Sequence, residues 1–190
     1  MTRRLYAALA LAGVAATLAP AFVAFAPRLI WNASASAPIG FYIVDVGGEP
    51  SVGDLVSVAP PPRVARFIAA RGYLPAGVPL LKRVAARAGQ RVCRDGDSVR
   101  VDGATLGRAR ASDSQGRPLP DWQGCRVLMD GEIFLMNADA PDSLDGRYFG
   151  PLPASAVRGR LIPLFTDPDG DGRFTWRVRD ALSSPQEIDP

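Results

Sequence analysis

The sequence predicts a mostly β domain preceded by a membrane-spanning helix. Residues 5–27 contain no charged side chain, and two arginines stand directly before them. Farther along, short apolar stretches alternate with turns of glycine, proline and aspartate, which is typical of antiparallel strands. The chain has 190 residues, of which 47% are hydrophobic, enough for one domain with its own core. We therefore expect an anchor over residues 1–27 and one domain over residues 28–190.

The apolar N-terminal run is long enough to cross a bilayer as a helix. Its 23 residues exceed the roughly 20 that the hydrocarbon core requires. Arg3 and Arg4 ahead of it favour a cytoplasmic N-terminus and an exported remainder. A cleavable signal peptide is the alternative, because Ala24 and Ala26 have the spacing of a cleavage site. Pro27 would follow the cut directly, which favours a retained anchor.

The composition restricts the chemistry that this chain can perform. It contains no histidine, which excludes Ser-His-Asp and Cys-His mechanisms and removes the commonest metal ligand. Of its 22 cationic side chains, 21 are arginines and one is Lys82. Burial can make a lysine neutral whereas an arginine stays charged, so Lys82 is the one nitrogen base available near neutral pH. The arginines are scattered and the net charge is +3, so no nucleic-acid partner is indicated.

Two serines stand on a predicted turn shortly after the apolar run. Ser34 and Ser36 are two residues apart, Pro38 and Gly40 turn the chain, and residues 41–44 form a predicted strand. A small hydroxyl side chain on a turn close to a membrane is a candidate nucleophile. The alternative is a polar linker, and the serines alone do not decide between the two.

The single lysine lies near the middle of a predicted strand over residues 78–85. Alternation places Leu80, Lys82 and Val84 on the same face of that strand. Apolar neighbours desolvate an amine and lower its pKa, which would leave Lys82 available as an uncharged base. The alternative is a strand-edge lysine with its head group in water.

The remaining elements follow from turn signals and apolar periodicity. An Asp-Gly pair at residues 102–103 between alternating segments predicts a hairpin. Pro62 stands at a suitable helix start and Gly72 ends the segment, which predicts a short surface helix between them. We expect strands over residues 52–58, 90–93, 98–101, 132–136, 157–165 and 174–178, a helix over residues 64–71, and a polar excursion over residues 104–124.

The two cysteines, Cys93 and Cys125, bracket the polar excursion. In an exported domain such a pair favours a disulfide. A cysteine nucleophile is disfavoured because no histidine is present to activate it. Residues 167–172 fit the first half of a calcium loop, but Val178 stands where the bidentate glutamate belongs. We therefore expect a plain turn there, and no metal or cofactor.

A polar loop after the predicted strand over residues 132–136 completes the set of candidate side chains. It carries Ser143, Asp145 and Arg147 ahead of a Gly-Pro pair. Asp145 and Arg147 can form a structural ion pair, and Ser143 can reach a neighbouring functional group. The residues alone indicate only a polar turn that is unusually rich in hydrogen-bonding groups.

Taken together, a turn serine, one lysine in an apolar strand and the lack of histidine predict a serine-lysine dyad. Neutral Lys82 would take the proton from Ser36 as its oxygen attacks a peptide carbonyl, and then return that proton to the leaving amine. The Ser36 N–H and the Ser34 hydroxyl would donate hydrogen bonds to the oxyanion.

Three separated segments resemble, in order and spacing, the signature boxes of type I signal peptidases: residues 34–42, 82–89 and 143–150. The closer resemblance is to the TraF-type peptidases of conjugative transfer systems, in which one residue separates the nucleophile from a proline. The chain departs from the residues usual in the family at Ala37, Phe41, Gln90 and Gly146, none of which belongs to the proposed dyad. The resemblance implies Ser36 as nucleophile, Lys82 as general base, Ser34 in the oxyanion hole, Ser143 orienting the amine, and Asp145 with Arg147 bracing the loop.

The resemblance also implies a signal-peptidase-like β fold, anchored in the inner membrane by the N-terminal helix with its active site in the periplasm. The implied substrate is an exported precursor cut after a small residue, which for the TraF branch is a pilin subunit. Other proteins of the conjugation machinery are implied partners. The alternatives are a housekeeping signal peptidase of broader range, a soluble self-cleaving repressor-type peptidase, which the apolar run opposes, and a catalytically inactive periplasmic pilus-assembly protein.

Overall fold

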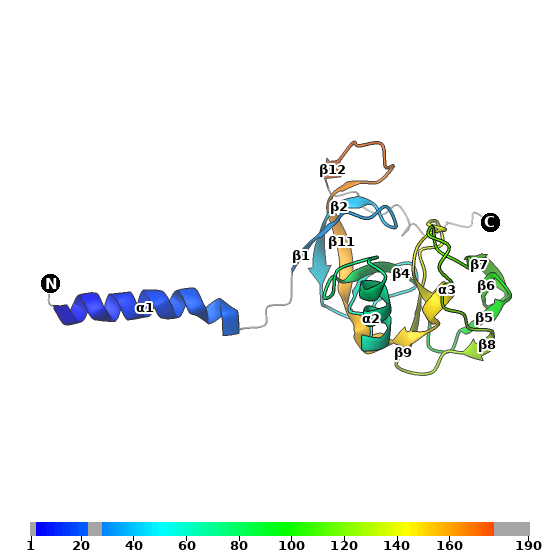
Figure 1. Ribbon diagram of the computed structural model, residues 1–190, viewed down its shortest axis with the longest axis horizontal. Coiled ribbons are helices and arrows are strands. Elements are labelled where there is room, and N and C mark those ends of the chain that lie inside the picture. The colour runs from blue at the N-terminus through cyan, green and yellow to red at the C-terminus, as the bar shows by residue number, and fades with distance from the viewer. Residues whose placement is uncertain (1–2, 23–27, 177–190) are drawn as a thin grey trace, which may run out of the picture.

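An N-terminal helix, α1 (Arg3–Phe22), precedes a domain built almost entirely of antiparallel strands (Figure 1). The structure, a computed structural model, describes residues 3–22 and 28–176 of the chain. Within those residues, no helix has both the length and the hydropathy that a membrane crossing demands. Part of the predicted anchor, residues 1–2 and 23–27, lies outside the described residues.

The larger of two sheets has eight strands, and all its pairings are antiparallel. These strands are β1 (Leu29–Asn32), β2 (Ile39–Asp45), β3 (Leu55–Val58), β4 (Leu80–Arg87), β9 (Glu132–Leu135), β10 (Leu152–Pro153), β11 (Val157–Asp167) and β12 (Thr175–Trp176). Their order is β1–β2–β11–β3–β4–β9–β10, and β12 pairs with β11. The predicted fold class, a mostly β domain of antiparallel strands, is therefore confirmed.

The smaller sheet has four strands and carries the disulfide. Its strands are β5 (Arg91–Asp95), β6 (Ser98–Val101), β7 (Ala104–Arg108) and β8 (Gly124–Val127), in the order β7–β6–β5–β8. Cys93 on β5 stands directly opposite Cys125 on β8, with a Cα–Cα distance of 4.0 Å, and the two are bonded. The predicted disulfide is thus confirmed, and it joins two neighbouring strands.

Three short helical segments connect the strands. They are α2 (Pro62–Ala70), α3 (Gly146–Phe149) and a 3-10 turn, η1 (Ala154–Ala156). α2 begins at Pro62, the predicted helix start, because proline is well suited to the first turn of a helix. Its Val64 and Ile68, one turn apart, are buried in the hydrophobic core with residues of β3, β4 and β9. α2 therefore covers one face of the strands that hold the lysine.

β4 is a central strand, buried on both faces where it begins. It pairs with β3 on one side and β9 on the other. Leu80 and Val84 belong to the core cluster beneath α2, whereas Leu81 packs with Tyr42 and other residues of β2, β3 and β11. Lys82, the residue after Leu81, has a relative exposure of only 5%. The predicted desolvated lysine is confirmed, and the alternative of a strand-edge lysine with its head in water is wrong.

Several predicted boundaries differ from the structure. The polar excursion does not start at residue 104, because the Asp102–Gly103 hairpin turns the chain into a further strand, β7. The strand expected over residues 52–58 starts only at Leu55. Gly40 lies within β2 rather than in the turn. At its place in β2, a Cβ atom would collide with the Phe165 carbonyl oxygen of β11. The predicted closing hairpin is formed by β11 and β12, although residues 177–178 lie outside the described residues.

Candidate active site

Ser36 lies in the wall of a cleft of about 420 Å³. The turn between β1 and β2 forms one side of the cleft, and the loops that follow β9 and β11 form the others. The loop after β11 is the segment that resembles a calcium site. There the Asp167 carboxylate accepts the backbone N–H groups of Gly170, Asp171 and Gly172, which is the bonding of a plain turn.

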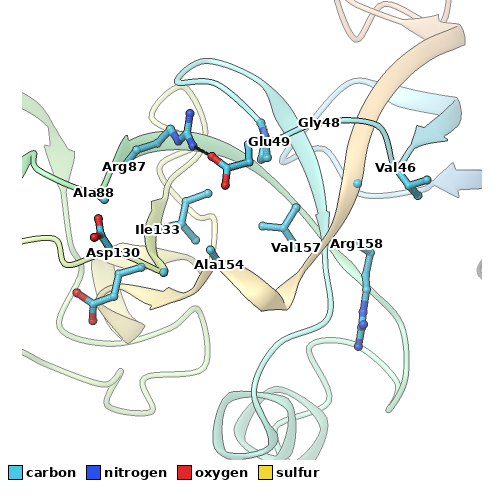
Figure 2. Close-up of a pocket in the computed structure, with 14 residues that line it drawn as sticks. Val46, Gly48, Glu49, Arg87, Ala88, Asp130, Ile133, Ala154, Val157 and Arg158 are labelled. Carbon is cyan, nitrogen blue, oxygen red and sulfur yellow. Dashed lines mark hydrogen bonds and ion pairs between the residues drawn. The ribbon is translucent and has the colours of Figure 1, made fainter.

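A larger cavity of about 520 Å³, drawn in Figure 2, lies at the other end of the same strands. It is lined by residues that follow β2 and β4 and by residues at the start of β9 and β11. The Ser36 cleft is lined by residues that precede β2 and by residues that follow β9 and β11. Arg87 and Glu49 form an ion pair across it (Figure 2). None of the predicted site residues lines this cavity, so size alone does not identify the candidate site.

The shape of the serine turn is held by the buried side chain of Asn32, at the end of β1. Its amide nitrogen donates to the carbonyl oxygens of Ser34, Ala37 and Pro38 at 2.9, 3.0 and 3.0 Å. Its Oδ1 accepts from the N–H and the hydroxyl of Ser34 at 3.0 and 3.1 Å. Sequence reasoning missed Asn32, because its partners are main-chain groups that only the turn brings together.

The two serine hydroxyls contact each other, with Ser34 Oγ 3.1 Å from Ser36 Oγ. A hydroxyl has one proton to donate, and that of Ser34 is directed to Asn32 Oδ1. Ser36 is therefore the donor in the serine pair, and its proton points toward Ser34. For Ser34 to donate to an oxyanion, as the resemblance implies, its hydroxyl must first turn away from Asn32.

The Lys82 amine is buried and donates a hydrogen bond to Ser143 Oγ at 2.7 Å. Burial lowers the pKa of Lys82 from the ordinary 10.5 to about 8. The negative charge of Asp145 opposes this lowering of the pKa, and the positive charge of Arg147 adds to it. A substantial fraction of the amine is thus neutral at mildly alkaline pH, as a general base requires.

Ser36 and Lys82 are not directly hydrogen-bonded within the described residues. Ser36 Oγ bonds to Ser34, and Lys82 Nζ bonds to Ser143. The side chain of Asn137 links the two segments instead, because its Nδ2 donates to the Ser36 carbonyl oxygen at 2.6 Å and to that of Leu81 at 3.1 Å. Asn137 was missed by sequence reasoning, although a buried asparagine directly after a strand is a recognisable signal.

A buried ion pair shapes the loop that carries Ser143. Arg147 Nη2 lies 2.8 Å from Asp145 Oδ2, and Nε lies 3.0 Å from Oδ1, with both side chains almost fully shielded from solvent. Arg147 Nη2 also donates to the carbonyl oxygens of Asn137 and Ala140 at 2.8 and 2.6 Å. The predicted ion pair between Asp145 and Arg147 is confirmed, and it fixes the path of the chain on either side of Ser143.

Gly146, one of the departures from the family pattern, has no room for a side chain. A Cβ atom there would stand 2.6 Å from Phe134 Cε2 and 2.7 Å from the Leu135 carbonyl oxygen. Trp122 closes the other side, because its Nε1 donates to the Gly146 carbonyl oxygen at 2.9 Å. Glycine at this position is therefore a consequence of how tightly α3 packs against β9 in this chain.

The chain matches the family described as signal peptidase, peptidase S26, over residues 1–165. It is 41% identical over 145 residues to a probable conjugal transfer protein TraF of Sinorhizobium fredii, covering 71% of this chain and 76% of that protein. It is 33% identical over 175 residues to a plasmid transfer protein TraF of Escherichia coli, covering 86% and 97%. Among solved structures, a signal peptidase I of Enterococcus faecalis matches with a TM-score of 0.37 and 20% identity, over 60% of this chain and 97% of that one.

We expect the Lys82 amine to titrate near pH 8 in the folded protein, because burial disfavours its charged form. The chain has one lysine, so labelling with ε-13C-lysine gives a single side-chain methylene signal whose shift reports the protonation state directly. In denaturant the same signal should titrate near its ordinary value of 10.5. A titration above pH 10 in the folded protein would contradict the dry environment described above.

Asp145→Asn should destabilise the domain by about 3–5 kcal/mol, because it leaves the buried Arg147 charge without its partner. It should also lower the Lys82 pKa, since the carboxylate that favours the charged amine is gone. Urea unfolding and the lysine signal measure the two effects. Asp142→Asn is the matched control, because Asp142 lies in the same loop as Asp145 but forms its ion pair, with Arg110, in solvent. An exposed ion pair contributes less than about 1 kcal/mol to the free energy of unfolding. Equal losses in both variants would count against the buried pair as the organiser of this loop.

Proposed function

Because this chain belongs to the signal peptidase family, peptidase S26, we propose that it is a serine endopeptidase that cleaves exported precursors, with Ser36 as nucleophile and Lys82 as general base. The observation that carries the proposal is the buried Lys82 amine, held by Ser143 and lowered in pKa to about 8. A neutral amine is what the reaction needs, and an arginine in its place could not provide one.

In the proposed first step the Ser36 hydroxyl turns from Ser34 to the neutral Lys82 amine, which takes its proton as Oγ attacks the scissile carbonyl. The Ser143 hydroxyl accepts one amine N–H, which orients the nitrogen lone pair. Lys82 then protonates the leaving amine. Water, deprotonated in turn by Lys82, hydrolyses the acyl-enzyme and frees Ser36.

The oxyanion of each step is stabilised by the Ser36 N–H and the Ser34 hydroxyl in this proposal. The Ser36 N–H has no hydrogen-bond partner among the described residues, so it is available. The Ser34 hydroxyl becomes available as a donor when it turns away from Asn32 Oδ1, which it contacts at 3.1 Å. Asn32 would hold the turn while Ser34 changes partner.

We propose that the substrate is a pilin precursor of a conjugative transfer system. The support is the likeness to proteins named for conjugal and plasmid transfer, at 33–41% identity. The cleft beside Ser36 has small apolar side chains in its wall, Ala35 and Ala37 among them, which suit a precursor cut after a small residue. A housekeeping peptidase of broader range remains the rival within the same chemistry, and further conjugation proteins are the proposed partners.

We also propose that the chain is a single-pass protein of the inner membrane with its catalytic domain in the periplasm. The apolar run over residues 5–27 behind two arginines supports this orientation. So does a cluster of aromatic rings on β1 and β2, which follow the helix in sequence, and on β11 and β12, of which β11 pairs with β2. Trp31 packs on Phe41 and Trp176 packs on Phe165, each pair with ring centroids 4.7 Å apart. Tryptophan at a membrane–water interface is a common arrangement.

Ser36→Ala and Lys82→Arg should both abolish precursor cleavage while leaving the protein folded. Lys82→Arg is the more informative change, because it keeps the positive charge and removes the capacity to be neutral. Full-length protein in detergent is incubated with candidate pilins encoded beside its gene, and the products are weighed. Arg87→Lys, a surface change at the far end of the same strand, should cleave like wild type. Cleavage that persists in Ser36→Ala would overturn Ser36 as the nucleophile, whereas no cleavage by the wild type would favour the inactive assembly protein.

Deleting residues 1–27 should move the protein from the membrane pellet to the soluble fraction after alkaline carbonate extraction of cells. The full-length chain should stay in the pellet and be digested when protease is added outside the inner membrane of spheroplasts. Protection from that protease would reverse the proposed orientation, and extraction of the full-length chain by carbonate would refute the anchor.

A further inference from the structure

The buried side chain of Asn137, 4% exposed, continues the sheet at the point where β9 departs from β4. Main-chain pairing ends with the Met136 N–H bonded to the Arg83 carbonyl oxygen. Beyond it the Asn137 amide takes the place of a peptide group. Its Oδ1 accepts the Arg83 N–H at 2.8 Å, and its Nδ2 donates to the Leu81 carbonyl oxygen at 3.1 Å. Two main-chain groups that flank Lys82 are thereby satisfied by one side chain.

The second proton of Nδ2 reaches a segment far away in the sequence. It is donated to the Ser36 carbonyl oxygen at 2.6 Å, across 101 positions of the chain. An amide has two N–H donors that diverge from one nitrogen, so both bonds share a fixed geometry. The main chain of Ser36 is consequently held at a set distance from the main chain of Leu81, the residue before Lys82.

The backbone of Asn137 is anchored by the ion pair of the same loop. Its N–H donates to Asp145 Oδ2 at 3.0 Å, and its carbonyl oxygen accepts from Arg147 Nη2 at 2.8 Å. Asn137 therefore has bonds to the serine turn, to the lysine strand and to the loop that holds Ser143. Its amide hydrogens are both engaged, which leaves none to donate to a substrate.

We propose that Asn137 is a positioning residue that holds the nucleophile Ser36 in register with the lysine strand. This inference rests on the proposed serine-lysine chemistry and names the contact that sets its geometry. Ser36 Oγ has one rotatable bond to its main chain, so displacing the serine turn displaces the attacking atom equally. A misplacement of about 1 Å costs an enzyme about 100-fold in rate.

Two substitutions separate positioning from space filling. Asn137→Ala removes the three side-chain bonds but keeps both backbone bonds to Asp145 and Arg147. Asn137→Asp keeps the shape and the acceptor for the Arg83 N–H, but it turns an oxygen toward the carbonyls of Ser36 and Leu81. We expect each variant to lower kcat about 100-fold with KM changed less than threefold, measured on an internally quenched peptide spanning the cleavage point of the precursor.

The NMR signal of the single lysine shows whether a variant also changes the pKa of the general base, Lys82. The Lys82 pKa in Asn137→Ala should stay near 8, because the amine and its Ser143 bond are untouched, and kcat is compared on the alkaline plateau. Val99→Ala is the stability control, since it opens a cavity in the core cluster that the smaller sheet shares with β4 and β9, and Val99 does not line the cleft. It should lose stability and keep its kcat at temperatures where all variants are folded.

Several outcomes would overturn the inference. They are a kcat within twofold of wild type in both variants, a raised KM with unchanged kcat, an Asn137→Asp variant as active as wild type, or a Lys82 pKa above 10 in Asn137→Ala. Hydrogen–deuterium exchange tests, without an activity measurement, whether Asn137 acts as a clamp that holds the serine turn against the lysine strand. Exchange of the Ser34 N–H, which Asn32 Oδ1 accepts, should rise at least tenfold in Asn137→Ala, and exchange over β5–β8 should remain as in wild type. An unchanged Ser34 N–H would refute the clamp. If wild type cleaves no precursor while the turn is loosened, the proposed function fails and the clamp stands.

Discussion

Removing one amine from water is the constraint on which the rest of this site depends. A charged ammonium buried to this degree is strongly disfavoured, so Lys82 sheds its proton more easily than an exposed lysine does. The surroundings then have to satisfy a neutral amine without recharging it. Ser143 supplies an uncharged acceptor, and the positive charge of Arg147 partly offsets the Asp145 carboxylate, which favours the ammonium form. The ion pair thus shapes the loop while its net charge near the amine stays close to zero.

The fold brings the groups together from three distant parts of the chain. The lysine comes from a central strand, the serines from a turn at the edge of the same sheet, and Ser143 from the loop after β9. Strand pairing places these segments in the same region, but it does not fix the exact distance between the serine turn and the lysine strand. Two asparagines make that adjustment, since Asn32 shapes the turn and Asn137 joins the turn to the strand.

Features that depend on local sequence were predictable, and features that depend on side chains meeting distant main chain were not. Alternation in one strand identified the buried face of Lys82, the Asp102–Gly103 pair identified a hairpin, and residues two apart identified the ion pair of Asp145 with Arg147. Asn137 bonds across 101 positions, so no local pattern contains its role. β1 and β10 are only four and two residues long, too short for a periodic signal, and they exist because a neighbouring strand offers pairing. The family membership, in contrast, was evident from three motifs in order.

The smaller sheet is, in topological terms, an insertion. β4 and β9 pair directly, with Val84 opposite Leu135, so everything between them leaves the larger sheet and returns to the same place. Two side chains bind it to α3: Arg94 donates to the Arg147 carbonyl oxygen at 2.7 Å, and Trp122 donates to that of Gly146. The inserted segment also shares a core cluster with β4 and β9. A change of length or sequence in its outer turns that keeps this core and those two donors should therefore leave the larger sheet, and the site that it carries, intact.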